Sequence, residues 1–155
     1  MTDTIEKRLA DRGIELPEAP APAANYVPWV VAGNLLFISG QLPLENGKLA
    51  YTGHLGREHK VLAGQRAAEL CAINVLAQAR AALSGHLERI GHLVRITGFV
   101  ASTPDFVEQH LVVNGASDLF AAILGDRGRH ARIAVGTAAL PLNASVEVEA
   151  IFQIA

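Results

Sequence analysis

The residues best suited to chemistry are an arginine and a glutamate in the C-terminal segment. Arg132 stands among small and apolar residues, and Glu147 follows later in the same segment. A guanidinium is planar and permanently charged, so it binds a carboxylate through two parallel hydrogen bonds. Glu147 could pair with such a cation or position a water molecule. Arg132 is therefore the best single candidate for an anion-binding residue.

A period of two in this segment predicts two strands that form a final hairpin. The first strand contains Ile133 and the second runs from Val146, with a turn over residues 141–144. In this register the apolar rows of both strands share one face, and Arg132, Glu147 and Glu149 share the other. Arg132 and Glu147 then lie roughly 20 Å apart in one chain, so they could cooperate only across a subunit boundary. Two interpretations of the charged face remain open. It is either an ordinary solvent-exposed surface, or a surface that something else covers, with Arg132 binding an anion there.

The preceding sequence predicts an α+β framework around this hairpin. The expected elements are a helix over 2–12, a proline-rich arm over 15–25, a hairpin from 26–31 and 35–39, a helix over 58–83, a strand over 93–101, and a helix that begins at Thr103-Pro104-Asp105 and kinks or restarts at Asn114-Gly115. The order β-β-α-β-α-β-β predicts a mixed or mostly antiparallel sheet with two helices on one face. We expect residues 1–22 to form a peripheral helix and arm, and residues 23–155 to form a single domain.

The composition excludes several classes of partner and site. The net charge is −2 without a basic cluster, which argues against nucleic-acid binding. The apolar run 27–38 is interrupted by Pro28 and Gly33, so it cannot span a membrane, which needs ~20 uninterrupted residues. Cys71 is the single cysteine, which fits a reducing cytoplasm, and we expect it to be buried and inert. A hydrophobic content of 50% with 18% charged residues hints at surface buried by oligomerisation.

Metal and cofactor sites are not expected. The six histidines show no metal-binding spacing apart from His54 and His59, which stand in a loop, and no nucleotide-binding motif is present. Asn74 lies on the apolar stripe of the first long helix, and we expect backbone groups to satisfy it. Ser39 has no visible catalytic partner and is expected to tie off a strand end.

These residues resemble a known family, the Rid (YjgF-like) reactive-intermediate imine deaminases. The matching positions are Ala131 to Val135, Leu140-Pro141, Val146 to Ile151, Tyr26-Val27, Gly33-Asn34, Ser39-Gly40-Gln41, Gln65, Asn74 and Asn114. The resemblance covers the chain from Ala23 onward. It implies a chorismate-mutase-like fold, assembled as a homotrimer with a central β-barrel and clefts between subunits.

In such a cleft, the resemblance implies hydrolysis of enamine and imine intermediates to 2-oxo acids and ammonia without a cofactor. Arg132 would bind the substrate carboxylate and Glu147 would position the attacking water. The cleft would be shaped by Tyr26, Ser39, Gly40, Asn114 and Ala134. The ligand would be a small carboxylate or imino acid, and no metal is implied.

Several positions depart from the family pattern. His130 stands where proline or alanine is usual, Ile133 replaces a small residue, Ala134 replaces a frequent cysteine, and Pro28-Trp29 replaces smaller or polar residues. These departures leave open a non-catalytic trimer that binds 2-oxo or other small carboxylates. Ribonuclease activity is a third hypothesis, which is disfavoured because no basic residues line up to bind phosphate.

Overall fold

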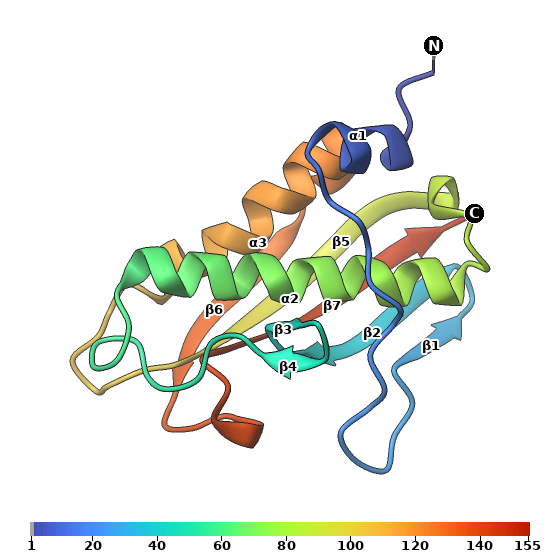
Figure 1. The fold of residues 1–155 in the computed structure, drawn as a ribbon. Helices are drawn as coiled ribbons and strands as arrows, with labels where there is room; N and C mark the ends of the chain where they lie inside the picture. The colour runs from blue at the N-terminus through green and yellow to red at the C-terminus, as the bar shows by residue number, and fades with distance from the viewer. Residues whose placement is uncertain (1) are drawn as a thin grey trace.

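The computed structural model describes residues 2–155 as a layer of helices packed on a sheet (Figure 1). The helices are α1 (Ile5–Asp11), α2 (Val61–Ala82) and α3 (Gln109–Leu124), with 3-10 turns at Leu87–Arg89, Gly125–Gly128 and Pro141–Asn143. The strands are β1 (Trp29–Ala32), β2 (Leu35–Gln41), β3 (Leu44–Glu45), β4 (Lys48–Leu49), β5 (Ile90–Ala101), β6 (Ala131–Thr137) and β7 (Val146–Ile154). Apart from the short β3–β4 pair and α1, the order is the predicted β-β-α-β-α-β-β.

The main sheet has the strand order β1-β2-β7-β5-β6. Strands β1, β2, β7 and β5 pair antiparallel in turn, whereas β6 adds to β5 in parallel after the crossover through α3. Figure 1 shows α2 and α3 lying across one face of this sheet. The mixed α+β fold with two long helices on one face is therefore confirmed.

The predicted final hairpin is wrong. Strands β6 and β7 do not pair with each other, because β5 lies between them. β7 runs antiparallel to β5, with Ile96 opposite Ala150, and β6 runs parallel to it, with Ile96 opposite Arg132. The turn over residues 141–144 thus connects two strands across β5 and does not set their register.

This topology also changes which face Arg132 occupies. Ile96 and Ala150 are buried beneath the helices, and residues paired across a sheet share a face, so Arg132 lies on the helix-covered face. Glu147 pairs with Phe99, which also pairs with the exposed Val135, so Glu147 lies on the open face. Arg132 and Glu147 therefore occupy opposite faces, contrary to the predicted hairpin.

The open face of the sheet carries apolar side chains that a single chain leaves uncovered. Phe37 on β2 and Ile133 and Val135 on β6 are exposed there, together with Val30 on the edge strand β1. A cluster of exposed apolar side chains on one face more often marks a surface that contacts another molecule than one that faces solvent. Among the described residues, no helix is long and apolar enough to cross a membrane.

The N-terminal helix packs on the domain and is not peripheral. Thr4 caps α1 by accepting a hydrogen bond from the backbone N–H of Lys7. Ile5 and Leu9 are buried, and Leu16 of the arm joins the same core. The Arg80 guanidinium fixes the arm by donating to the carbonyl of Leu16 at 3.2 Å. This segment is therefore part of the packed structure.

The second long helix begins later than predicted. Thr103 does not cap it, because α3 starts at Gln109 and the Thr103 hydroxyl has no hydrogen-bond partner among the described residues. The helix is also continuous through Gly115. A Cβ at Gly115 would collide with the backbone carbonyl of Gln65, so this glycine allows α2 and α3 to approach closely.

Two buried side chains follow the predictions. Asn74 is almost fully buried and donates to the carbonyls of Leu42 and Leu44 at 3.0 and 3.1 Å. Cys71 on α2 is buried, and burial raises the pKa of its thiol well above the usual value. Both are structural residues.

Candidate functional site

Arg132 is held against α3 by a chain of hydrogen bonds. Its Nη2 donates to the His110 carbonyl at 2.8 Å, and its Nη1 donates to the Ser117 hydroxyl at 3.1 Å. Ser117 Oγ lies 2.8 Å from His130 Nε2, and His130 Nδ1 lies 2.6 Å from the Gly128 carbonyl. A carbonyl only accepts, so Nδ1 carries the proton and Nε2 accepts from Ser117. The relay runs from Arg132 through Ser117 to His130.

Burial lowers the pKa of His130, and the nearby Arg132 cation adds to the effect. His130 therefore stays neutral at neutral pH. Its Nε2 then carries no proton and can accept the hydrogen bond from Ser117. Only two of the five guanidinium N–H groups of Arg132 are used in these contacts, so the others can receive an anion.

Two further predicted site residues lie beside Arg132. Asn114 lies on α3 between His110 and Ser117, at the three- and four-residue spacing that places all three on one side of the helix. Ala134 is two positions beyond Arg132 on β6 and therefore shares its face. We call Arg132, Asn114 and Ala134 the arginine cluster.

The other predicted site residues gather at the end of β2. Gly40 packs against the Glu147 carboxylate so closely that a Cβ at Gly40 would overlap it. The Ser39 hydroxyl donates to the carbonyl of Val27 at 2.8 Å, next to Tyr26. Tyr26 and Gly40 line the same cavity. We call Tyr26, Ser39, Gly40 and Glu147 the glutamate cluster.

Glu147 is half-buried, and no hydrogen bond or ion pair of its side chain was found among the described residues. Burial raises its pKa above the ordinary glutamate value of 4.5, and the neighbouring Glu149 raises it further. A carboxylate with a raised pKa is a better base once ionised, so Glu147 is suited to proton transfer with a bound water.

The two clusters cannot form one site within a single chain. The arginine cluster lies on the helix-covered side of the edge strand β6, whereas Glu147 lies on the open face of β7, with β5 between the two strands. The topology of the sheet therefore keeps Arg132 and Glu147 apart within one chain, in place of the predicted separation along a hairpin.

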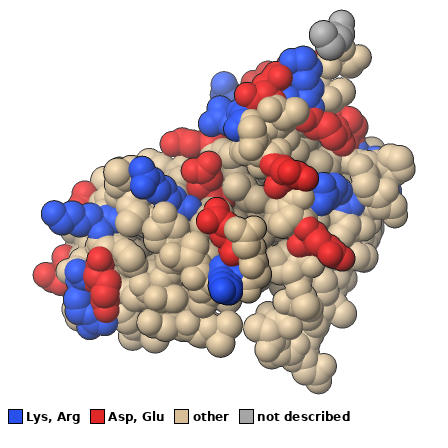
Figure 2. Space-filling model, viewed as in Figure 1, with Lys and Arg blue, Asp and Glu red and all other residues tan. Residues whose placement is uncertain are grey.

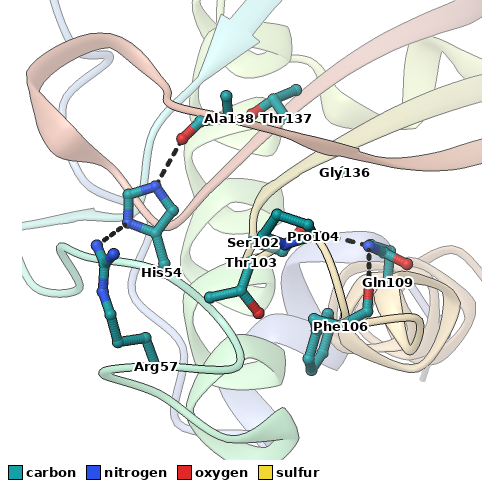
Figure 3. A pocket seen from close by; sticks show the side chains of 10 residues that line it. All are labelled: His54, Arg57, Ser102, Thr103, Pro104, Phe106, Gln109, Gly136, Thr137 and Ala138. Carbon is teal, nitrogen blue, oxygen red and sulfur yellow. Dashed lines mark hydrogen bonds between the residues drawn. The ribbon is translucent and has the colours of Figure 1, made fainter.

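A cavity of about 510 Å³ lies further along β6 and was missed by the sequence analysis. It is lined by His54, Arg57, Ser102, Thr103, Pro104, Phe106, Gln109, Gly136, Thr137 and Ala138 (Figure 3). Gly136 shares the face of Arg132, and Gln109 directly precedes His110, so the cavity extends along the same side of β6. Its residues come from loops, from the start of α3 and from the end of β6, and no local sequence pattern brings these separate segments together.

Within this cavity His54 lies between Arg57 and the end of β6 (Figure 3). Its Nε2 lies 2.6 Å from the Ala138 carbonyl, and its Nδ1 lies 2.9 Å from Arg57 Nη2. A carbonyl only accepts and a guanidinium only donates, so His54 carries its proton on Nε2 and is neutral. The adjacent Glu58 accepts from the His54 backbone N–H, which with the Arg57 guanidinium lowers the pKa of Glu58 to about 2.

These contacts bear on the histidines considered as metal ligands. His59 places Nε2 2.6 Å from the Thr52 carbonyl, so His54 and His59 both use a ring nitrogen on the backbone. Among residues 2–155, no group of three or more His, Cys, Asp or Glu side chains is arranged to hold a metal ion.

Residues 6–153 match the family model described as "YjgF/chorismate_mutase-like, putative endoribonuclease". Over 151 residues the chain is 49% identical to Protein TCP17 of Trypanosoma cruzi, an alignment that covers 97% of this chain and 94% of that protein.

Two solved structures extend the comparison. Protein Atu1372 of Agrobacterium tumefaciens, described as of unknown function, superposes with a TM-score of 0.93 at 59% identity, covering 99% of this chain and 94% of that one. RidA from an Antarctic Psychrobacter superposes with a TM-score of 0.61 at 29% identity, covering 88% of this chain and 94% of that one.

Proposed function

The chain belongs to the YjgF/chorismate-mutase-like family, and from this premise we propose that it hydrolyses 2-imino acids to 2-oxo acids and ammonia. The observation that carries the proposal is the pre-oriented Arg132, which keeps donors free beside Asn114 at the edge of the sheet. The similarity to a RidA structure supports the same class of activity.

The proposed reaction needs little beyond positioning, because an imine carbon is already electrophilic. Arg132 binds the carboxylate of the substrate, and Glu147 accepts a proton from water as its oxygen bonds to the imine carbon. The imine nitrogen takes up protons and leaves as ammonia when the carbon–nitrogen bond breaks, and the carbonyl of the 2-oxo acid remains. The chemistry uses no cofactor.

We place this reaction between copies of the chain in a homotrimer. Each cleft would combine the arginine cluster of one copy with the glutamate cluster of the next. The exposed Phe37, Ile133 and Val135 of the open face would be buried as the sheets form a central barrel. A partner copy would thus cover the apolar surface and complete the site.

The direct test uses imines generated in situ by an amino-acid oxidase. Decay of the imine and release of the 2-oxo acid should both be faster with the protein than without it, and the effect should saturate. Thermal stabilisation by 2-oxo acids without any acceleration would instead favour the non-catalytic binder. If the protein shows no turnover and no binding, both hypotheses are contradicted.

The surface charge does not favour RNA as a substrate. On the face shown in Figure 2, acidic and basic side chains are interspersed and form no continuous basic surface. Binding to a nucleic-acid backbone requires such a surface. The net charge of −2 also disfavours a polyanion such as RNA.

Loss of the Ser117 hydroxyl should weaken substrate binding more than turnover. Ser117→Ala removes one acceptor that fixes Arg132, and a hydrogen bond of this kind contributes about 1 kcal/mol, so we expect KM to rise about fivefold with kcat little changed. Ser117→Thr keeps a hydroxyl and should restore KM. Steady-state kinetics of the three proteins tests this, and an unchanged KM in Ser117→Ala would show that the relay does not position Arg132.

A further inference from the structure

A second and more enclosed cavity lies under the proline-rich arm, beside the glutamate cluster. It measures about 230 Å³, and Tyr26 and Gly40 of the glutamate cluster form part of its lining. The rest of its wall comes from residues 20–23 of the arm, from Pro28, from Gln41 at the end of β2 with Leu42 and Leu44 after it, from Gln78 on α2 and from Leu142. The cavity therefore adjoins the position proposed for the water.

The arm is fixed in place as one wall of this cavity. The Arg80 guanidinium donates to the carbonyl of Pro17 at 3.0 Å, and the Gln78 amide donates to the carbonyl of Pro20 at 2.7 Å. Prolines have a restricted φ and no N–H, so the arm presents an apolar surface with little conformational freedom. The wall is thus formed before any ligand arrives.

The chemistry of the lining selects the kind of group that fits. The apolar lining residues are Pro20, Ala21, Pro22, Ala23, Pro28, Leu42, Leu44 and Leu142, with the ring of Tyr26. No charged side chain is among the described residues that line the cavity, and burying an unpaired charge there would be costly. Gln78 is 1% exposed, and its Oε1 has no hydrogen-bond partner in the described chain.

The volume sets the size of the group. A cavity of about 150 Å³ is enough to bind benzene in another protein, so about 230 Å³ holds a group much larger than a methyl. We infer that this cavity receives the side chain of the substrate, and that the chain acts on 2-imino acids with a bulky uncharged side chain, from isobutyl to benzyl. This inference rests on the proposed deaminase function and specifies its substrate class.

The test compares imines derived from alanine and from phenylalanine. Because a well-fitting apolar group contributes about 10-fold or more to discrimination, kcat/KM should be at least about 10-fold higher for the phenylalanine-derived imine. Ala21→Trp places a large side chain in the cavity, and it should lower kcat/KM for this imine about 10-fold more than for the alanine-derived imine. Ala24→Trp, an exposed arm position outside the cavity lining, is the matched control and should leave both values unchanged.

The outcomes separate the two levels of the proposal. Faster hydrolysis of the alanine-derived imine, or the same substrate ratio in Ala21→Trp and Ala24→Trp, would overturn the assignment of the cavity and leave the deaminase function standing. If neither imine is hydrolysed faster than in buffer, the proposed function fails and the substrate assignment fails with it.

Discussion

Replacement of Arg132 by alanine is expected to lower kcat/KM for 2-imino acids about 100-fold or more. A charge-assisted, two-pronged hydrogen bond to a carboxylate contributes about 3 kcal/mol, and each ~1.4 kcal/mol corresponds to a factor of ten. Arg132→Lys keeps the charge but cannot make the paired contact, so we expect an intermediate loss. Turnover of imines by the three proteins under identical conditions measures the effect.

The control for charge loss alone is Arg129→Ala. The Arg129 side chain is 85% exposed, and its contact with Asp126 is long at 3.8 Å, so its removal should not change activity. Circular dichroism should show that both variants fold. Full activity in a folded Arg132→Ala protein would remove the basis of the proposed function.

Replacement of Glu147 by glutamine is expected to lower kcat about 100-fold to 10,000-fold, the range that loss of a general base produces. Glutamine preserves the shape beside Gly40, so the loss would reflect proton transfer and not packing. KM should change much less, because Arg132 still binds the carboxylate. Saturation kinetics of the variant separates the two parameters.

The pH dependence offers a second measurement on Glu147. The base must be ionised, so kcat/KM should fall as pH falls through the Glu147 pKa, which burial places above the ordinary 4.5. Glu149→Gln removes the neighbouring negative charge that contributes to this rise, so the acid limb should move to lower pH. An acid limb that is the same in the wild type and in Glu149→Gln would indicate that another group is titrating.

Local periodicity predicted most elements, but it did not predict that β5 lies between the last two strands, β6 and β7. The alternation in β7 correctly placed Val146 and Val148 under the helices. The same pattern in β6 misled, because Ile133 and Val135 are apolar yet lie on the open face. A period of two shows that two faces differ, and it cannot tell a core inside one chain from a surface that another chain would cover.

The position of Arg132 depends on the crossover through α3, which inserts β6 on the far side of β5. Sequence patterns carry little information on such non-local pairing. The cavities were equally out of reach, since His54 and Gln109, or Pro20 and Gln78, come together only in the folded chain. The resemblance supplied the site residues, and the fold shows that they form two separate clusters.

The most direct test of the account is complementation between two inactive variants. Arg132→Ala and Glu147→Gln proteins are mixed in equal amounts, dissociated, reassembled and assayed for imine hydrolysis. If each cleft takes Arg132 from one copy and Glu147 from the next, random reassortment in a trimer restores both residues in about one quarter of the clefts, with about that share of wild-type activity. Exchange of subunits without any recovery of activity would contradict a site shared between copies.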